Sequence, residues 1–511
     1  MIGFGRPSPP PSRLNSSPAS ASSAVPSLEN PVSASRRPRG FQLRIREIPL
    51  GDPFALYAAL RRKSRTCFLL ESAPGPERLA EFSYLGFDPV CVFTLKGDKL
   101  YRDGRVLERG RRKDVLAVLR EVLREHRPPL DVRHPKYLGG LVGYFSYDFA
   151  GHMEPSLALR EHEAFPTLEL GLYLDGVVFD HRNGRAFYFS FGEDRFSQVE
   201  ECLERANAKG LPPSDLGEQL RVGPWEESLP QGAFEAAVGE ALGAIRAGEV
   251  FQLVLSRRLA APYAGDLLAF YRRLRELNPS PYMYALEFYR GSAEERVIWG
   301  SSPEMLVAVR GRRVITYPIA GTRPLGRTPE EQARYAQELL ADEKESAEHA
   351  MLVDLARNDV GRVSAFGSVR VPQYKTLERF SHVQHLVSRV EGDLREGYDA
   401  LDALTALFPA GTVTGAPKLR AMEWIERLEP EPRGPYAGVV GYLSLTGDLD
   451  TAIAIRTLFA SRGRLFLQAG AGVVADSLPA HEYRETERKL DALRAALALA
   501  QGQELREEGS R

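Results

Sequence analysis

Cysteine is scarce in this sequence, with three residues in 511. Cys67, Cys91 and Cys202 lie far apart and form neither a disulfide framework nor a C-x-x-C metal or redox motif. A reducing compartment is therefore expected, and any bound metal is expected to have oxygen ligands. Long apolar runs are missing too, because no stretch approaches the ~18 uninterrupted apolar residues of a membrane span. These absences predict a cytoplasmic protein that does not cross a membrane.

An excess of charge of either sign is also missing. The 67 Lys and Arg residues nearly balance the 68 Asp and Glu residues, for a net charge of −1. Nucleic acids and anionic membranes are bound through an excess of Lys and Arg, so neither is expected as a partner. The composition, 43% hydrophobic and 26% charged, is ordinary for a globular protein. The length suggests two or three domains, or one large composite domain.

The first forty residues stand apart from the rest of the chain. They are rich in Ser, Pro, Ala and Arg, and Glu29 is their only acid. Such a segment buries too little apolar surface to offset the entropy of ordering it, so residues 1–40 are predicted to be disordered. The segment is either a dispensable tail or a transit peptide, which has the same composition and would direct the protein to a plastid.

Beyond the tail, short strand-like runs bounded by Gly turns alternate with long helical patterns. Residues 306–318 and 451–468 each predict a hairpin, and hairpins indicate antiparallel sheet rather than βαβ units. Helices are predicted at residues 329–357, 417–428 and 482–500. The predicted fold class is α/β of the α+β type: a large composite fold of two related halves, with antiparallel sheets flanked by helices.

Two seven-residue stretches resemble each other, which supports the idea of two halves. Residues 140–146 read Gly-Leu-Val-Gly-Tyr-Phe-Ser, and residues 438–444 read Gly-Val-Val-Gly-Tyr-Leu-Ser. A Pro-rich stretch at residues 211–230 has the composition of a linker between them. We therefore place an N-terminal region at residues 41–225 and a C-terminal domain, which holds the active site, at residues 226–505.

Two acidic pairs with helical spacing are the most informative chemical feature. Glu345 and Glu348 lie one turn apart on one helix, and Glu482 and Glu485 repeat the spacing on another. Like charges at this spacing destabilise a helix unless a cation sits between them. Each pair is either a solvated, salt-bridged face or half of a site for a hard divalent cation such as Mg²⁺.

Three further features indicate an anionic ligand. The loop at residues 409–418, with Thr414 as a possible N-cap and with Lys418, is either an anion site or an ordinary capped loop. The segment Gly470–Gly472 is either a close backbone approach to a carboxylate or a tight turn. Arg456 lies within an apolar run, and we favour a buried anion as its partner over a solvent-facing position. Together these features predict a small, anionic substrate that reacts with help from a metal.

In this order and at these separations, the motifs resemble those of the chorismate-utilising enzymes, most closely the large subunits of anthranilate synthases. The resemblance runs from about Leu69 to Lys489. Its motifs are Leu-Leu-Glu-Ser at 69–72, Asn-Pro-Ser-Pro-Tyr-Met at 278–283, Gly-Ser-Ser-Pro-Glu at 300–304, Pro-Ile-Ala-Gly-Thr-Arg at 318–323, the acidic run at 342–359, and the segments 409–418 and 468–472. The resemblance implies that chorismate and ammonia are converted to anthranilate and pyruvate.

The resemblance also assigns roles by position. It implies Mg²⁺ that neutralises the ring carboxylate, with Glu348 and Glu485 as metal ligands and Glu345 and Glu482 in the acidic shell around them. The implied catalytic residues are Glu304, which protonates the departing hydroxyl, together with His385 and Gln252. The residues implied to bind chorismate are Gly321, Thr322, Tyr436, Arg456, Gly470, Ala471 and Gly472.

Two positions help to choose among relatives. Gln252 occupies the position where water-using isochorismate and salicylate synthases carry a lysine base, and ammonia needs no such base. Ala320 occupies the position where aminodeoxychorismate synthases commonly carry a lysine that attacks the ring. Both favour anthranilate as the product. The alternatives are aminodeoxychorismate synthase component I, on the folate route, and a non-catalytic, tryptophan-sensing partner of a glutaminase.

The resemblance finally implies an inhibitor and a partner. Ser72, Pro281, Tyr282 and Met283 match the family's tryptophan site, which implies feedback inhibition by L-tryptophan. No cysteine has the Gly-x-Cys-x-Gly setting of a glutaminase nucleophile, so ammonia is expected from a separate glutamine amidotransferase small subunit in a hetero-oligomer. Alone, the chain is expected to use free ammonium, best at alkaline pH where more NH₃ is present.

Overall fold

The structure, a computed structural model, describes residues 42–72, 81–109, 114–128, 135–207, 217–326, 328–379 and 383–503. The tail at residues 1–40, predicted to be disordered, lies outside the described residues. One compact unit spans Gly40–Arg511, on both sides of the boundary placed at residues 225 and 226. Within the described ranges, no helix combines the length and the apolar character needed to cross a membrane.

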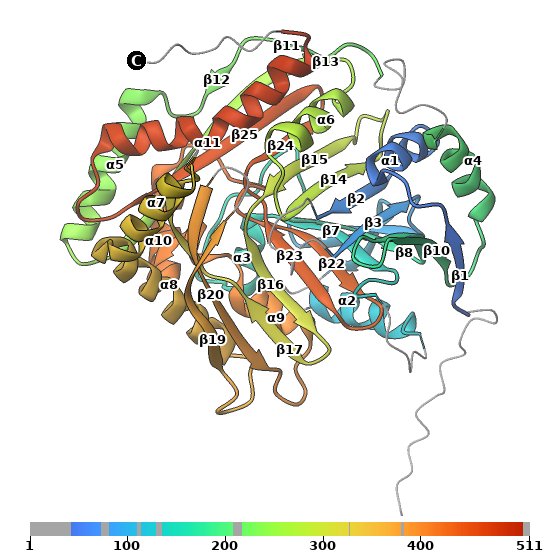
Figure 1. Ribbon diagram of the computed structural model, residues 1–511, viewed down its shortest axis with the longest axis horizontal. Coiled ribbons are helices and arrows are strands. Elements are labelled where there is room, and N and C mark those ends of the chain that lie inside the picture. Colours follow the sequence, from blue (N-terminus) through green and yellow to red (C-terminus); the bar gives the residue numbers. More distant parts are fainter. Residues whose placement is uncertain are drawn as a thin grey trace, which may run out of the picture. The chain divides into compact units, whose positions relative to one another are not determined.

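The described residues form two large antiparallel sheets, each with strands from both sides of that boundary (Figure 1). This confirms the predicted fold class. In spatial order, sheet A consists of β1 (Arg44–Ile48), β10 (Arg185–Ser190), β9 (Asp175–Asp180), β3 (Phe82–Phe87), β2 (Cys67–Glu71), β14 (Tyr282–Phe288), β15 (Arg296–Ser302), β24 (Thr457–Ser461), β25 (Arg464–Val473), β13 (Gln252–Ala264) and β11 (Arg221–Val222). The short strands β12 (Glu226–Glu227) and β21 (Gly415–Ala416) also pair with β13.

Sheet B lies against sheet A and is built in the same way. In spatial order it consists of β18 (Ile319–Pro324), β20 (Val383–Asp393), β17 (Arg313–Thr316), β16 (Met305–Arg310), β23 (Leu449–Ile453), β22 (Val439–Ser444), β7 (Gly140–Phe145), β8 (Leu168–Tyr173), β4 (Cys91–Lys96), β5 (Lys99–Arg102) and β6 (Arg105–Arg109). Strand β19 (Arg370–Arg379) pairs with β20. Side chains of both sheets, such as Tyr84 and Leu170, share one hydrophobic core.

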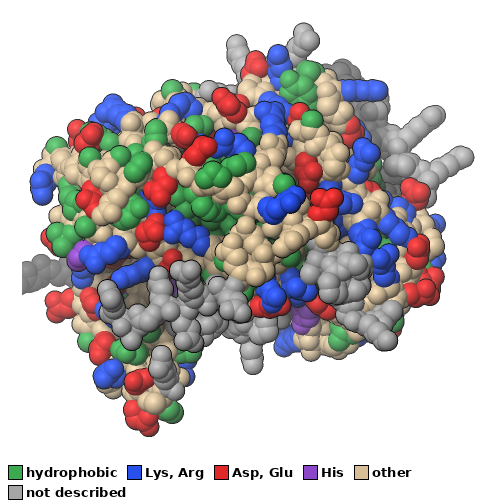
Figure 2. Space-filling view, turned by 90° about the horizontal axis from the view of Figure 1, so that it is seen from above, with side chains coloured by type: hydrophobic (Ala, Val, Ile, Leu, Met, Phe, Trp, Pro, Cys, Tyr) green, Lys and Arg blue, Asp and Glu red, His purple; other side chains and the backbone are tan. Residues whose placement is uncertain are grey.

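Helices cover the sheets. They are α1 (Pro53–Arg61), α2 (Asp114–Glu125), α3 (Ala150–Met153), α4 (Phe196–Asn207), α5 (Gln231–Arg246), α6 (Leu268–Leu277), α7 (Pro329–Ala341), α8 (Glu343–Gly361), α9 (Ala400–Leu407), α10 (Lys418–Leu428) and α11 (Pro479–Ala500). Helices α1, α4, α6 and α11 enclose a second core with sheet A. Helices α7 and α8 contact β18 and β20. Acidic and basic side chains are intermixed over the face shown in Figure 2, in keeping with the near-zero net charge.

The chain crosses between the two sheets at two adjacent places. Strand β15 of sheet A leads through Pro303 and Glu304 into β16 of sheet B, and β23 of sheet B leads through residues 454–456 into β24 of sheet A. Because β15 pairs with β24 and β16 pairs with β23, the two crossings lie side by side. The Ile453 amide donates to the Glu304 carbonyl at 3.0 Å, so the crossings are bonded to each other.

The second crossing corrects one prediction. Residues 451–459 read as a single strand in the sequence, but the structure divides them between two sheets. The break lies at Arg456, whose φ of 51° is in the left-handed region that interrupts a strand. The hairpin predicted at residues 306–318 is confirmed as β16 and β17.

The helix predicted at residues 329–357 is also divided. Helices α7 and α8 meet at Asp342, whose backbone is extended and whose carboxylate accepts from the Glu345 amide at 3.0 Å. Asp342 is therefore an N-cap inside the acidic run, a role that suits a short side chain with an acceptor oxygen. The helices predicted at residues 417–428 and 482–500 are confirmed as α10 and α11, the latter starting at Pro479.

The two repeated stretches are neighbours in sheet B. Strands β7 and β22 pair with each other, with Gly143 opposite Gly441. A Cβ atom added at Gly143 would lie 2.0 Å from the Glu169 carbonyl oxygen, and one at Gly441 would lie 2.1 Å from the Asp450 carbonyl oxygen. The repeated glycines thus allow the close approach of backbones at the junction of the two halves.

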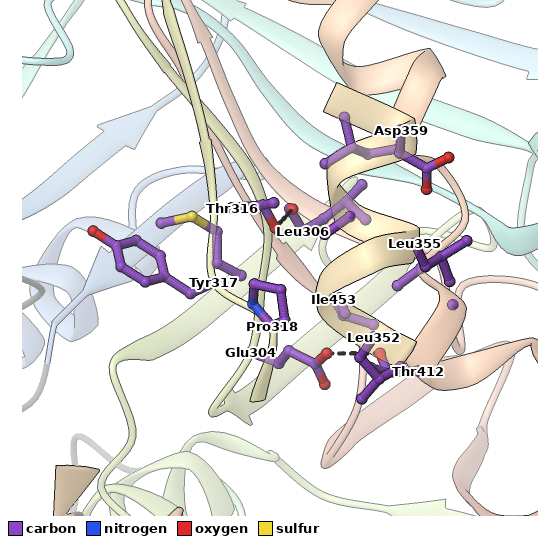
Figure 3. A pocket seen from close by; sticks show the side chains of 15 residues that line it. Glu304, Leu306, Thr316, Tyr317, Pro318, Leu352, Leu355, Asp359, Thr412 and Ile453 are labelled. Carbon is purple, nitrogen blue, oxygen red and sulfur yellow. Dashed lines mark hydrogen bonds between the residues drawn. The ribbon is translucent and has the colours of Figure 1, made fainter. Parts of the chain in front are cut away.

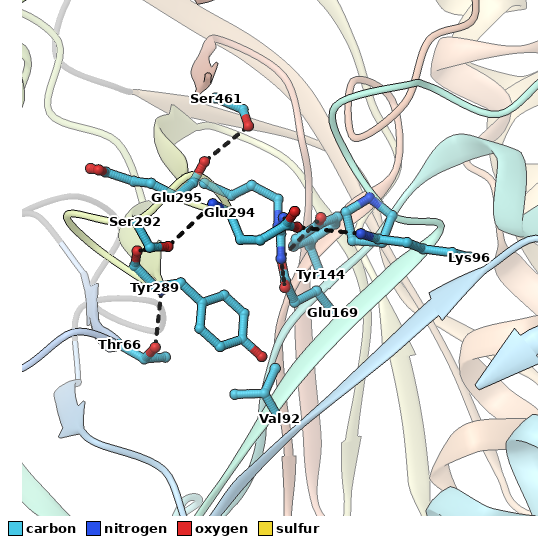
Figure 4. Close-up of polar contacts among 12 residues, drawn as sticks. Thr66, Val92, Lys96, Tyr144, Glu169, Tyr289, Ser292, Glu294, Glu295 and Ser461 are labelled. Atoms are coloured by element: carbon cyan, nitrogen blue, oxygen red, sulfur yellow. Dashed lines mark hydrogen bonds and ion pairs between the residues drawn. The ribbon is translucent and has the colours of Figure 1, made fainter. Parts of the chain in front are cut away.

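A buried ion pair joins the two sheets. Arg296 of β15 donates to both carboxylate oxygens of Glu169 of β8, at 2.7 and 2.5 Å. The Tyr144 hydroxyl donates to the same carboxylate (Figure 4). Towards solvent, Arg296 also pairs with Glu294, which pairs with Lys96. The bidentate geometry satisfies both charges, which is what makes their burial tolerable.

We expect Gly441→Ala to lower the free energy of unfolding by about 1–3 kcal/mol, because the added methyl group collides with backbone rather than with a movable side chain. Gly243→Ala, in the open space on α5, is the matched control and should raise stability by about 0.5–1 kcal/mol. Urea titration of both variants checks this. Equal stability of Gly441→Ala and the parent would contradict the close approach.

Candidate active site

A cavity of about 230 Å³ opens beside the two crossings. Its wall combines both crossings with β18, β20, β25, α11 and the 3-10 turn at Gly411–Val413. The residues predicted from the sequence that line it are Glu304, Thr322, His385, Tyr436, Arg456, Gly470 and Gly472. Ala320 lines it too, so the position that holds a lysine in aminodeoxychorismate synthases faces the cavity.

Glu304, in the first crossing, is the acid of this cavity. Burial raises the pKa of its carboxyl group to about 7, against the opposing effects of a hydrogen bond from Thr412 and of the charges on Lys489 and Arg456. The Thr412 hydroxyl donates to Oε1 at 2.6 Å, and Figure 3 shows the two side chains pointing toward each other. A smaller cavity, of about 50 Å³, shares Glu304 and Thr412 with the main one. Near neutral pH the carboxyl group can therefore hold a proton and release it.

Arg456, in the second crossing, supplies a positive charge. Burial lowers the pKa of its guanidinium, and Glu304 is the acid whose charge opposes that effect. Its guanidinium forms no ion pair with any residue that the structure describes. Lys489 of α11 also lines the cavity, where its ammonium pairs with Glu485 at 2.7 Å and donates to the Gly470 carbonyl at 2.9 Å. Because the Arg456 guanidinium has little solvent and no acidic partner among the described residues, an anionic ligand in the cavity would stabilise its charge.

His385 of β20 lies opposite Thr322 of β18. Its Nδ1 is 2.9 Å from the Gly321 carbonyl oxygen and 3.1 Å from the Thr322 hydroxyl. Since a carbonyl can only accept, Nδ1 carries the proton of the neutral ring. Burial lowers the pKa of His385, and nearby Arg456 lowers it further, so the imidazole is neutral at pH 7.

The glycine-rich segment at residues 470–472 is part of a strand. This excludes the tight turn, which was one of the two alternatives in the sequence analysis. Gly470, Ala471 and Gly472 belong to β25 and pair with β13. Gly470 and Gly472 line the cavity together with Gln468 and Ala469 of the same strand, while Ala471 does not. A Cβ atom at Gly470 would lie 3.0 Å from the Tyr436 hydroxyl, so the missing side chain keeps this wall open.

The four helix carboxylates lie beyond the cavity lining but act on one another. Burial raises the pKa of Glu348, and repulsion from Glu345 of its own helix, then from Glu485 and Glu482 of α11, raises it further. Burial likewise raises the pKa of Glu482, with a contribution from Glu485. Gln252 of β13 donates to Glu348 at 3.4 Å. Carboxylates of the two helices therefore act on one another across α8 and α11.

The carboxylates do not form a complete metal cage. In the part of the chain that the structure describes, no group of three or more His, Cys, Asp or Glu side chains is placed to hold a metal ion. Glu345 is engaged by Arg323 at 3.4 Å, and its Oε2 lies 3.2 Å from where a Cβ atom of Gly321 would be. Mg²⁺ needs only one or two protein carboxylates, because water and substrate oxygens supply its other ligands. Glu348 of α8 and Glu485 of α11 are therefore a sufficient number of carboxylates for that ion.

In the loop at residues 409–418, neither Thr414 nor Lys418 has the role that the sequence suggested. Thr414 is not an N-cap: its hydroxyl donates to the Ala410 carbonyl, and α10 is capped at Pro417. Lys418 is not an anion site either, because its ammonium pairs with Asp359 at 2.9 Å and donates to the Leu407 carbonyl. The sequence showed a cation near a helix start but could not show that a distant acid on α8 neutralises it.

Two residues of the site escaped the sequence analysis. Thr412 donates to Glu304, and Lys489 adds the second cation. Lys489 could have been found from its spacing of four residues after Glu485, which puts both on one face of α11. Thr412 gave no such signal, because its partner lies more than a hundred residues earlier in the chain.

The residues matched to a tryptophan site also meet, outside the cavity lining. Met283 pairs with Glu71 between β14 and β2, so Ser72 lies beside Tyr282, the first residue of β14, and Pro281 comes directly before it. The Tyr282 hydroxyl donates to Asp450 at 3.1 Å.

Comparison of the sequence with known proteins shows which family the chain resembles over most of its length. The family model of the chorismate binding enzymes matches residues 65–495. Anthranilate synthase component 1 of Methanothermobacter marburgensis is 45% identical over 465 residues, which is 91% of this chain and 95% of that protein. The protein of the same name from Methanothermobacter thermautotrophicus is 45% identical over 89% of this chain and 94% of its own length.

A solved structure of an anthranilate synthase component I is also similar to this chain in its fold. The crystal structure of anthranilate synthase component I from Streptococcus pneumoniae matches with a TM-score of 0.71 and 38% identity, covering 81% of this chain and 92% of that chain. The chain therefore belongs to the chorismate binding enzyme family and, within it, to the anthranilate synthase component I group.

Proposed function

We propose that this chain converts chorismate and ammonia to anthranilate, pyruvate and water. The observation that carries the proposal is the cavity beside the crossings. A protonatable Glu304 lines it together with Arg456, a half-buried cation without an ion-pair partner among the described residues. Chorismate is a small dicarboxylic acid with a hydroxyl group to lose. Its carboxylates suit Arg456 and Lys489, and the glycine-lined wall of β25 leaves room for a flat ring.

The cavity residues can divide the chemistry between them. Glu304, protonated near neutral pH, donates its proton to the ring hydroxyl that leaves as ammonia adds. His385, neutral at the same pH, is able to accept a proton during the later loss of pyruvate. Ala320 leaves no amine to attack the ring, so ammonia is the nucleophile and anthranilate is favoured over aminodeoxychorismate.

Magnesium is proposed to bind at the converging carboxylates, with Glu348 and Glu485 as its protein ligands and with Glu345 and Glu482 beside them. Support comes from the mutual repulsion that raises the pKa of Glu348, which a divalent cation would relieve. Bound there, Mg²⁺ would neutralise the ring carboxylate of the substrate.

A separate glutamine amidotransferase subunit is proposed as the source of ammonia. The name "component 1" of the relatives implies a second component. The three cysteines of this chain are buried and free, and burial raises the pKa of Cys91 to about 11, so none has the character of a thiolate nucleophile.

Inhibition by L-tryptophan is proposed at the residues gathered beside β2 and β14, namely Ser72, Pro281, Tyr282 and Met283. A buried polar environment lies next to them. The Tyr137 hydroxyl is buried without a hydrogen-bond partner in the described parts of the chain, and its ring centre is 5.1 Å from that of Tyr442. Tyr442 lies opposite Asp450 in sheet B, and Asp450 accepts the hydrogen bond from Tyr282. A ligand with an indole N–H and an amino-acid head could use such groups.

The purified chain with chorismate, ammonium and Mg²⁺ should produce fluorescent anthranilate without an added lyase, and Glu304→Gln should lower kcat by about 10²–10⁴-fold, since it removes the proton donor. At a fixed concentration of free NH₃, the rate should fall as pH rises through about 7, because Glu304 loses its proton there. At fixed total ammonium, the rate should instead gain from the NH₃ formed at alkaline pH. Glu391→Gln, a buried glutamate of β20 outside the cavity, is the control and should retain activity. Accumulation of aminodeoxychorismate would contradict the proposed product.

We expect Glu348→Ala to abolish chorismate turnover at ordinary Mg²⁺ concentrations, because it removes one of two proposed metal ligands. Removal of Mg²⁺ with a chelator should abolish chorismate turnover by the parent protein, and added Mg²⁺ should restore that turnover. Glu343→Ala, at the exposed start of the same helix, serves as control and should respond to Mg²⁺ as the parent does. Full activity of the chelated parent would rule out the metal.

L-Tryptophan should bind the parent with measurable heat in isothermal titration and inhibit it. Ser72→Ala should weaken that binding by roughly fivefold, or about 1 kcal/mol for one lost hydrogen bond, without changing turnover. Ser292→Ala, on an exposed turn, is the matched control. If saturating tryptophan gives no heat and leaves activity unchanged, there is no such site.

A further inference from the structure

A buried ion pair between Glu429 and Arg433 lies behind the cavity wall. Glu429 is 3% exposed and Arg433 is 4% exposed. Arg433 donates through Nε to Oε2 at 2.9 Å and through Nη2 to Oε1 at 2.7 Å, so the pairing is bidentate. Neither residue lines the cavity, and the proposed chemistry uses neither of them.

Arg433 also holds two parts of the wall by their backbone. Its Nη1 donates to the Val413 carbonyl at 2.7 Å, and its Nη2 donates to the Val254 carbonyl at 2.7 Å. Both valines line the cavity. Val413 directly follows Thr412, the residue that donates to Glu304. One guanidinium therefore ties the turn that carries Thr412 to strand β13.

The Glu429 side of the pair reaches a further part of the wall. Its Oε1 accepts from the Ser256 amide at 2.7 Å and from the Ser256 hydroxyl at 2.8 Å. Gln468, which lines the cavity, donates to that hydroxyl at 2.8 Å. On the other side, the Arg433 guanidinium carbon lies 5.7 Å from the centre of the Tyr436 ring. The same guanidinium carbon lies 4.7 Å from the centre of the Tyr147 ring, which is not part of the cavity wall. The hydrogen bonds of the pair therefore reach three parts of the cavity wall, at Val413, Val254 and, through Ser256, Gln468.

We propose that Arg433, held by Glu429, is a positioning residue that fixes the orientation of Thr412 and through it the carboxyl group of Glu304. The inference rests on the proposed function only for what Glu304 does. A lysine at position 433 would keep the charge opposite Glu429, but one ammonium cannot reach two carbonyls and two carboxylate oxygens in a planar fork. Arg433→Lys therefore loosens the turn while the buried charge stays balanced.

The kinetic test compares Arg433→Lys with Arg296→Lys, which makes the same substitution in the buried, bidentate pair with Glu169, away from the cavity. Arg433→Lys should lower kcat about tenfold or more with KM for chorismate little changed, because misplacement affects the reacting geometry more than binding. Arg296→Lys should lose thermal stability without that drop. In a cycle with Thr412→Val, the double variant should be no slower than the slower single variant, since both changes act through one hydrogen bond.

A second measurement reads the position of Glu304 without turnover. The Thr412 hydroxyl holds the pKa of Glu304 down against burial, and the other charges that face it are Arg456 and Lys489, with neutral His385 on the same cavity wall. Loosening of the turn should therefore raise the pKa of Glu304. Carboxyl-carbon NMR of glutamate-labelled protein, with the signal assigned by its loss in E304Q, should show this rise in R433K and T412V but not in R296K.

An additive loss of activation free energy in the double variant, or an unchanged Glu304 titration in R433K, would overturn the proposal. If R433K does not fold, E429Q takes its place in both measurements. Failure of both to fold, while R296K folds, would also overturn it, since the pair would then be part of the scaffold only. Absence of chorismate turnover by the parent contradicts the proposed function alone, because the NMR titration still tests the positioning.

Discussion

The cavity depends on one constraint: the chain passes twice between the same two sheets, at neighbouring positions. Strand pairing on both sides aligns the two passages, and a backbone hydrogen bond joins them. Residues at such a passage belong to neither sheet, so their side chains need not follow the alternation of a strand. Glu304 and Arg456 occupy these positions, which explains how an acid and a cation far apart in the sequence come to face one small space.

Arginines away from the open surface serve two different purposes in this fold. Arg296 and Arg433 are each paired with a carboxylate through both oxygens, so their charges are fully satisfied within the protein. Arg456 has no such partner among the described residues, and burial lowers its pKa while raising that of Glu304. The same loss of solvent that gives Glu304 a useful proton near neutral pH leaves Arg456 in need of an anion. The unsatisfied charge marks the ligand site, and the satisfied charges support it.

Much of this could be predicted from the sequence. Short hairpins indicated the antiparallel sheets, and the spacing of Glu345 with Glu348 and of Glu482 with Glu485 predicted an acidic pair on each of two helices. That the two pairs act on one another is seen only in the structure. The errors have a common cause. Asp342 as an internal N-cap, Lys418 neutralised by Asp359, and the turn at Arg456 each depend on a distant segment or on a backbone angle. Thr412 was missed for the same reason, because only folding brings it to Glu304.

The double passage has a mechanical consequence. The backbone segments that carry Glu304 and Arg456 are each anchored at one end in sheet A and at the other end in sheet B. A small slide of one sheet along the other would reorient both groups together, with no need to touch either directly. A change in the packing of the sheets would therefore reach the proton donor and the cation together, through the backbone that carries them.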